Sequence, residues 1–231
     1  MYLMKSQLPE AMKRKMIKLA ITAFLLTAVM ASCTKDEVKP ELEDGKSTVI
    51  KDLPGDVGNT VGSGIPFTPF YFSFKTAAKV DEAKKVSTEW DIAFAKEYNS
   101  YVSVNNGTDN GSFGYGGAAT GAMIVINQAY DQVKEAPSDA TFSSNGITSA
   151  GWDPGSGNGW YFYDLKTHIA VPVLNRTYVL RTAEGKYAKL QLISMYQGAP
   201  ATVTDLNWPA PYFTFRYFVQ QDGSRNLSTK D

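Results

Sequence analysis

Histidine and cysteine, the residues on which many enzyme sites depend, are almost absent from this chain. Its 231 residues include one cysteine, Cys33, and one histidine, His168. A single cysteine cannot form an internal disulfide, so the folded part must be stable without one. A single histidine does not supply the clustered ligands of a zinc site. It would also have to serve alone as the base of a serine or cysteine triad, and no GxSxG elbow accompanies it.

Nucleotide and nucleic-acid signatures are also missing. The glycine-rich residues 105–121 contain no GK[ST] and lack a strand-to-helix context, which excludes a phosphate-binding loop and predicts a mobile loop. Residues 1–32 hold five of the 23 Lys/Arg and one of the 23 acids, so the remainder is weakly acidic. We therefore expect no nucleic-acid partner, since such proteins normally carry a basic stripe. Acids at this frequency are expected as solvated surface rather than as a glycosidase pair, so we predict no enzyme.

A long apolar run is absent, but a short one follows a basic head. The cluster KRKMIK at residues 13–18 precedes the apolar residues 19–30, and small residues come next. This run is too short to span a bilayer and has the order of a secretory signal peptide, which predicts export and a signal peptide over residues 1–32. Because a charged head usually lies near the initiator, Met12 fits as the true start, with residues 1–11 an upstream extension.

Cys33 ends this segment in the sequence MASC, which resembles a bacterial lipobox whose cysteine becomes the lipidated N-terminus. The alternative is an incidental cysteine, but its uniqueness and position favour lipidation. The next four residues, TKDE at 34–37, resemble the acidic signal of Bacteroidetes lipoproteins that face the cell exterior from the outer membrane. Residues 33–48 are rich in charged residues and poor in aromatics, which predicts a lipidated cysteine on a flexible acidic tether.

A hairpin over residues 175–196 is the clearest structural element. Its first arm is rich in β-branched and aromatic residues, and Gly185 supplies the positive φ that such a turn needs. In the returning arm Ala188, Leu190, Leu192 and Ser194 alternate with Lys189 and Gln191. This alternation predicts an antiparallel strand with one face in water, on which Lys189 would lie.

Several further short strands are predicted, separated by Gly/Pro-rich turns and long loops. A helical turn or two is expected at residues 128–134, and no long helix is predicted. The strands are expected at residues 70–75, 90–95, 101–104, 122–126, 159–164 and 212–220. Residues 49–231 therefore form one all-β antiparallel domain, sandwich-like or barrel-like. Its many aromatic residues suit a pocket for a flat apolar ligand, and core packing accounts for most of them.

Four segments resemble the HmuY-type lipoprotein family of Bacteroidetes: WDIAF at residues 90–94, NGW at 158–160, YVLRTAEGKYAKL at 178–190 and FTFRY at 213–217. The resemblance covers about residues 49–227, and RTAEGKYAKL is its most specific part. It implies an all-β HmuY-type domain with long loops, a lipid anchor in the outer membrane, and binding of haem b for iron acquisition. A TonB-type outer-membrane receptor would be the partner.

The resemblance also implies axial ligands to haem, two His or two Met, from a loop before the Gly-Trp strand and a loop after it. Residues 138–158, the earlier loop, contain no His, Met or Cys. The later loop offers His168, and the other candidate haem ligands are Met123 and Met195, whose strand patterns equally fit core packing. Two functions stay open: haem capture, or an accessory surface lipoprotein of the same fold that binds another ligand or a partner protein.

Overall fold

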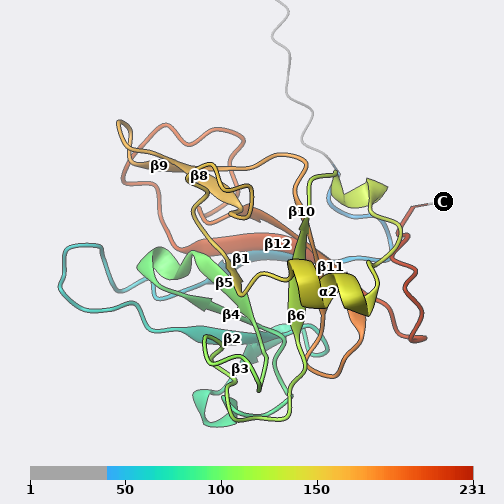
Figure 1. The fold of residues 1–231 in the computed structure, drawn as a ribbon. Helices are drawn as coiled ribbons and strands as arrows, with labels where there is room; N and C mark the ends of the chain where they lie inside the picture. Colours follow the sequence, from blue (N-terminus) through green and yellow to red (C-terminus); the bar gives the residue numbers. More distant parts are fainter. Residues whose placement is uncertain (1–40, 231) are drawn as a thin grey trace, which may run out of the picture. The chain divides into compact units, whose positions relative to one another are not determined.

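Residues 41–230 are described by a computed structural model, in which every strand pairing between neighbours in the sheets is antiparallel (Figure 1). Sheet A has the order β1 (Thr48–Pro54), β12 (Tyr212–Val219), β11 (Tyr187–Ser194), β10 (Thr177–Arg181) and β6 (Ala122–Ile126). Sheet B has the order β3 (Ala78–Val80), β2 (Phe70–Ser73), β4 (Ile92–Ala95), β5 (Tyr101–Val104) and β7 (Ser149–Ala150). A separate hairpin pairs β8 (Tyr161–Asp164) with β9 (Ile169–Pro172). The helices are short: η1 (Glu82–Lys84), η2 (Glu97–Asn99), η3 (Tyr130–Gln132) and α2 (Asp139–Asn145).

Sheets A and B pack face to face through aromatic side chains. Phe94 of β4 lies 4.6 Å from Phe213 of β12 between ring centroids, and Phe72 of β2 lies 5.2 Å from Phe215. All four side chains are fully buried. Since burying a Phe side chain contributes about 1.5–3 kcal/mol, these contacts are a main source of stability. The predicted all-β sandwich is confirmed, and over residues 41–230 no strand pairing closes the sheets into a barrel.

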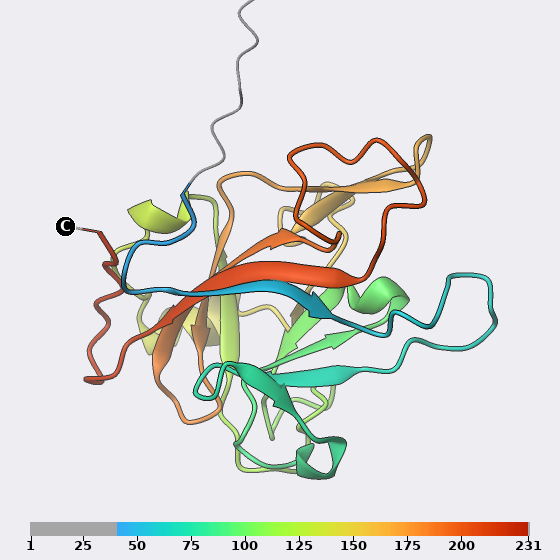
Figure 2. The same cartoon turned by 180° about the vertical axis from the view of Figure 1, so that it is seen from behind.

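The hairpin of β10 and β11 forms as the sequence predicted. Tyr178 pairs with Leu190 and Arg181 with Tyr187, and Gly185 has a φ of +83° in the connecting turn. β12 runs beside β11 on one side and β1 on the other, which Figure 2 shows from behind. The strand at β1 was not predicted from the sequence, because its residues alternate weakly and end in turn-forming residues.

The outer face of sheet A is not exposed to water as predicted. Lys189 lies on it beside Val179, and Lys189 is fully buried. Its Nζ donates to the backbone oxygens of Tyr130 and Val133, at 3.0 and 3.1 Å, and to Thr229 Oγ1 at 3.1 Å. The prediction that Lys189 faces water is therefore wrong, because segments distant in sequence cover this part of the strand.

Those covering segments have a small core of their own. Val179 and Ile124 of sheet A pack there with Phe142 of α2 and Leu227 near the C-terminus. The N-cap of α2 is Ser138, whose hydroxyl accepts from the Thr141 N–H, which explains why a helix begins within a stretch predicted to be turns. Sheet A thus has apolar contacts on both faces.

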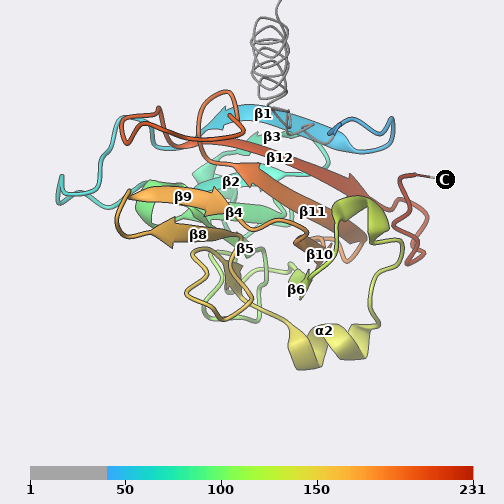
Figure 3. The ribbon, with the colours of Figure 1, turned by 90° about the horizontal axis from the view of Figure 1, so that it is seen from above.

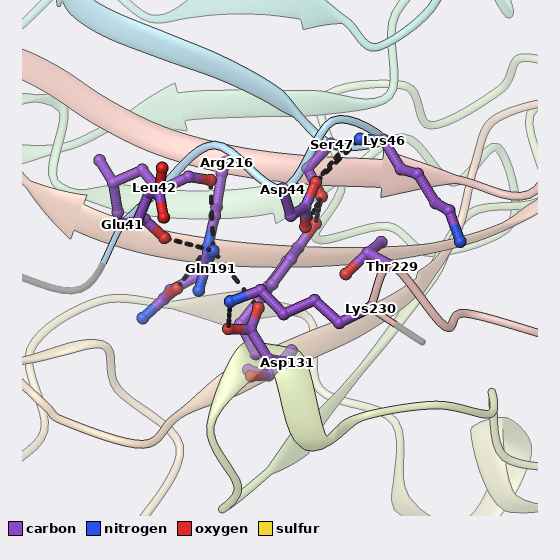
Figure 4. A network of polar contacts seen from close by, with 12 residues as sticks. Glu41, Leu42, Asp44, Lys46, Ser47, Asp131, Gln191, Arg216, Thr229 and Lys230 are labelled. Atoms are coloured by element: carbon purple, nitrogen blue, oxygen red, sulfur yellow. Dashed lines mark hydrogen bonds and ion pairs between the residues drawn. The ribbon is translucent and has the colours of Figure 1, made fainter.

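A polar network joins both ends of the described chain to sheet A (Figure 4). Arg216 of β12 donates to Gln191 Oε1 at 2.8 Å and to the Leu42 carbonyl at 3.2 Å. Asp131 lies 3.4 Å from the Arg216 guanidinium and 2.7 Å from Lys230 Nζ. Residues 41–47, which the sequence assigned to the tether, therefore include contacts with the folded sheet.

The glycine-rich loop after β5 is held by many internal hydrogen bonds. Asn106 Nδ2 donates to the Gly121 carbonyl at 2.8 Å, and Gly107 N donates to the Ala119 carbonyl at 2.8 Å. Asn105 Nδ2 donates to the carbonyls of Ser87 and Trp90. These bonds attach the loop to β4 and β5 and to the segment before them.

Two sequence predictions lie outside the described residues. These are the signal peptide over residues 1–32 and lipidation at Cys33. Within residues 41–230 no helix is long and apolar enough to cross a membrane.

Candidate functional site: an exposed aromatic surface beside His168

The hairpin of β8 and β9 presents His168 at its turn. Tyr163 pairs with Ala170 and Asp164 with Ile169, so residues 165–168 connect the strands. Asp164 Oδ1 accepts from Lys166 N at 2.7 Å, and hydrogen bonds of this kind lower the pKa of the Asp164 carboxyl. The backbone of His168 has a φ of +59°, and its N–H donates to the Asp164 carbonyl at 2.7 Å. The turn therefore fixes the backbone position from which the His168 side chain extends.

Two aromatic rings stand next to this imidazole. The Tyr163 ring centroid lies 6.0 Å from that of His168 and 6.3 Å from that of Trp152. Tyr163 Oη lies 3.0 Å from His168 Nδ1, within hydrogen-bonding distance. That bond engages one ring nitrogen and leaves Nε2 as the nitrogen available to a ligand.

These side chains belong to an exposed apolar surface, which we call the hairpin surface. Trp152 is 41% exposed and Leu165 is 70% exposed. Tyr163 and His168 complete it and are exposed, whereas Phe162, the residue before Tyr163 in β8, is exposed on the opposite face of the hairpin. Large apolar side chains gathered on the outside of a soluble domain typically mark a binding site.

The hairpin projects at one margin of the molecule, away from β3 (Figures 1 and 3). The loop between β11 and β12 runs beside it in both views. In that loop Trp208 Nε1 donates to the Gln197 carbonyl at 2.9 Å, and Leu206 is 61% exposed. Leu206 is therefore an exposed apolar side chain of this loop.

A buried ion pair fixes the loop that carries Trp152. Arg176 Nη1 donates to Asp153 Oδ2 and to the Gly159 carbonyl. The side chains are 9% and 1% exposed. Burial opposes ionisation of Asp153, but hydrogen bonds from Arg176 and from the amides of Gly157 and Gly155 outweigh it and lower its pKa. Asp153 is therefore an anion that holds residues 153–159 in one arrangement.

The base of the hairpin is buried and rigidly bonded. Trp160 Nε1 donates to the Ser100 carbonyl at 2.7 Å, and the Ser100 hydroxyl lies 2.9 Å from Tyr161 Oη. The Tyr196 hydroxyl accepts from Ala170 N at 2.9 Å. Burial raises the pKa of Tyr161 to about 12, so its hydroxyl is neutral at physiological pH. The exposed tip thus stands on a fixed base.

Met123 and Met195, the other predicted haem ligands, are buried. Met123 lies in β6 opposite Leu180 and is 0% exposed. Met195 follows β11 and is 5% exposed. The next residue is Tyr196, whose hydroxyl accepts from Ala170 N of β9. Both pack in the core between the sheets. The structure does not bring Met123 to the hairpin, and haem ligation by any of the three predicted residues stays a prediction.

The earlier loop, where the family resemblance implies a second axial ligand, spans residues 138–158 and contains α2 and β7. It has no His, Met or Cys. Among the described residues, no group of three His, Cys, Asp or Glu side chains could hold a metal ion. His168 offers an imidazole nitrogen that could bind a haem iron, and the Tyr163 hydroxyl, a ligand type that also binds haem iron, is engaged with His168 Nδ1.

Sequence reasoning missed Trp152, Phe162 and Leu165 as surface residues. The sequence did carry a signal for this exposure, because residues 160–163 are all aromatic and do not alternate with polar residues. A two-stranded hairpin cannot bury both faces of such a strand unless other elements cover each face. Phe162 and Val171 pair on the outer face and are 49% and 51% exposed.

No family model and no curated protein matches the sequence. Solved structures similar to the chain include apo PinO from Porphyromonas gingivitis, with TM-score 0.45 and 10% identity over 76% of this chain and 98% of that one. They also include an apo HmuY analogue from Tannerella forsythia, with TM-score 0.42 and 12% identity over 77% and 96%. A proposed HmuY-like haem-binding protein from Bacteroides vulgatus has TM-score 0.37 and 15% identity over 74% and 90%. Two of these three structures are thus described as an HmuY analogue and an HmuY-like protein, the class that the sequence resembled.

Proposed function

We propose that this chain captures haem b at the hairpin surface, as an exported lipoprotein held by Cys33 at the outer face of the outer membrane. The observation that carries the proposal is the exposed surface of aromatic side chains whose tip presents His168. Haem is flat and largely apolar, and Trp152 and Tyr163 offer rings of the same character. An exposed apolar patch of this kind is stabilised by a ligand that covers it.

The residues present fit haem with one protein ligand. Haem iron accepts an imidazole nitrogen as an axial ligand. The hydrogen bond between Tyr163 Oη and His168 Nδ1 orients the imidazole and selects Nε2, as hydrogen bonds to the other ring nitrogen do at metal-binding histidines. Because the earlier loop has no ligating side chain, His168 would be the only axial ligand from this chain.

Capture, rather than chemistry, is the proposed role. The hairpin surface holds no carboxylate pair, and the proposal gives its one hydroxyl beside an imidazole, Tyr163 Oη next to His168 Nδ1, the role of orienting the histidine. A protein that captures haem must also release it, and a TonB-type receptor in the outer membrane is the proposed recipient. Iron acquisition would follow from that transfer.

A second candidate is an accessory lipoprotein of the same fold that binds a protein at the cell surface. The outer face of the hairpin favours it, because Phe162 and Val171 are exposed there side by side. The missing ligand in the earlier loop also favours it, since two axial ligands are expected from the family resemblance.

Titration of the purified protein with haemin, followed by absorbance, separates these functions. We expect a sharpened Soret band in the native protein and a shifted or lost band in His168→Ala. Tyr163→Phe keeps the ring but removes the hydrogen bond to His168, and about tenfold weaker binding is expected. Met123→Leu is the matched core control and should titrate like the native protein.

A spectrum equal to that of free haemin in the native protein would remove haem capture. An unchanged Soret band in His168→Ala would remove the assigned ligand. Circular dichroism of each variant verifies that the fold is intact before titration.

A further inference from the structure

A concave region lies at the other end of the β11–β12 ladder from the hairpin surface. This cleft has a volume of about 420 Å³, within the range of small-molecule sites. Lys186 lies beside it just before β11 begins, whereas the residues after β11 contact β9. An eight-residue strand is roughly 25 Å long, so the cleft and the hairpin surface are separate.

Three lysines from three parts of the chain line the cleft. Lys46 precedes β1, Lys75 lies in the β2–β3 turn and Lys186 in the β10–β11 turn. Glu184 and Asp91 are the carboxylates among the lining residues. Cationic side chains therefore outnumber anionic ones in the cleft, although the chain has equal numbers of both.

A buried carboxylate fixes two walls of the cleft. Asp91 Oδ2 accepts from Phe74 N at 2.7 Å, and Asp91 Oδ1 accepts from Ala183 N at 3.0 Å. The β2 end and the β10–β11 turn are thus bonded to the same side chain. Because both oxygens face backbone N–H groups, the Asp91 carboxylate is directed into the protein and repels a ligand in the cleft less than an exposed one would.

An aromatic pair adds an apolar part to the lining. The rings of Phe74 and Tyr217 are stacked with centroids 4.4 Å apart. Tyr217 Oη donates to the Phe74 carbonyl at 2.9 Å, so the pair is fixed. A preorganised site costs less conformational entropy on binding than a site that must be ordered by its ligand.

The ion pair at the mouth of the cleft is weak. Lys75 Nζ lies 3.7 Å from Glu184 Oε1, and the side chains are 78% and 46% exposed. Lys186 Nζ donates to Gln221 Oε1 at 2.8 Å, a neutral partner. An exposed pair of this length contributes little, so an anion can replace Glu184 as the partner of Lys75.

We propose that this cleft binds a small anion with at least two carboxylate or phosphate groups, held by Lys46, Lys75 and Lys186 above the Phe74–Tyr217 pair. The proposal assigns a role to the segment RTAEGK, which forms the β10–β11 side of the cleft and takes no part in the hairpin surface. It is independent of haem capture.

Calorimetric titration of the purified protein at low ionic strength tests the proposal, with citrate and pyrophosphate as probes and glucose as the neutral control. We expect saturable binding of at least one anion and none of glucose. Tighter binding of citrate assigns a carboxylate ligand, and tighter binding of pyrophosphate assigns a phosphate ligand. Higher salt should weaken binding, because exposed charges are screened.

Three charge variants locate the site. Lys75→Gln with Lys186→Gln should weaken binding by about tenfold or more, and Glu184→Gln should strengthen it about threefold. Lys51→Gln with Lys85→Gln removes the same charge outside the cleft and should change binding by less than about twofold. All five positions are at least partly exposed, so the fold should be retained.

Absence of saturable binding of either anion would overturn the proposal. So would binding that Lys75→Gln with Lys186→Gln leaves unchanged. Amide NMR shifts provide an independent readout: shifts at residues 183–186 on addition of anion support the cleft, and shifts confined to the β8–β9 hairpin contradict it.

Discussion

The guanidinium carbon of Arg216 lies 4.1 Å from the centroid of the Tyr130 ring, and Lys189 Nζ lies 4.3 Å from the same centroid. Two cationic side chains of sheet A thus contact one aromatic ring from η3. Each cation–π contact of this kind contributes about 0.5–2 kcal/mol. The ring and its backbone carbonyl together hold η3 against the sheet.

Lys189→Met should destabilise the protein by roughly 2–4 kcal/mol, because two buried carbonyls and a hydroxyl lose their donor. Urea unfolding measures this change. Lys51→Met, at an exposed position, is the matched control and should stay within about 0.5 kcal/mol. A Lys189 variant as stable as the control would show that burial of the ammonium cancels its hydrogen bonds.

Lys189 should also make the free energy of unfolding depend on pH. Burial lowers the pKa of Lys189 to about 8, whereas a lysine in the unfolded chain titrates near 10.4. Between these values the unfolded chain binds more protons, so the contribution of Lys189 to stability rises with pH. We expect native unfolding free energies to show this rise and Lys189→Met to lack it, and equal slopes from pH 8 to 10 would contradict the assignment.

Arg176→Met should cost about 3–5 kcal/mol, since it leaves the buried Asp153 carboxylate without its cation. Chemical unfolding gives the value, and Asp153→Asn in the same background should recover part of it. The control is Arg181→Met, whose pair with Asp139 is 3.4 Å long and partly exposed, so a loss below about 1 kcal/mol is expected. Similar losses for both arginines would refute the special role of Arg176.

Above pH 10 the protein should lose stability. Burial raises the pKa of Tyr161 to about 12 and that of Tyr217 to about 12, whereas an unfolded tyrosine titrates near 10. The unfolded state therefore releases these protons first, and each tyrosine contributes roughly 2 kcal/mol less at pH 12 than at pH 10. Thermal unfolding across this range measures the loss, and Tyr161→Phe should flatten it. A midpoint independent of pH would contradict the argument.

Two phenylalanines distinguish packing from binding. Phe94→Ala should cost about 3–5 kcal/mol, because Phe94 is fully buried between the sheets. Phe162→Ala should change stability by no more than about 0.5 kcal/mol, because the side chain is half exposed. Under the second candidate function, Phe162→Ala should instead weaken capture of a protein partner in a pull-down from the cell surface. A large loss of stability in Phe162→Ala would identify it as a core residue.

The alternation of apolar and polar residues along short segments predicted most of the strands. β6 was predicted with its observed bounds, and the core face of β12, with Phe213, Phe215 and Tyr217, was also predicted. Which side chains of a strand share the core face follows from residues within that strand alone. The burial of Lys189 could not be predicted this way, because the covering residues 130–133 and 229 are distant in sequence and carry no local sign of where they pack.

The candidate site was only partly predictable. His168 was singled out because it is the only histidine, and the structure places it at the turn of a hairpin whose second strand, β9, was not predicted. β9 has four residues, too few for a clear alternation. Trp152 was isolated in a loop, and two contacts that the sequence does not reveal bring that loop beside Tyr163: the Arg176–Asp153 pair, and the backbone bond from Asp153 N to the Tyr161 carbonyl at 2.8 Å.

The polar network around Asp131 brings the beginning and the end of the described chain together. Lys230 reaches Asp131, and the Thr229 side chain bonds to Asp44, while Leu42 accepts from Arg216. A short glycine-serine linker could therefore join residue 230 to residue 41 without disturbing a strand. New termini in the exposed loop between Val57 and Ile65 would then give a circular permutant with the same sheets, in which every strand keeps its neighbours.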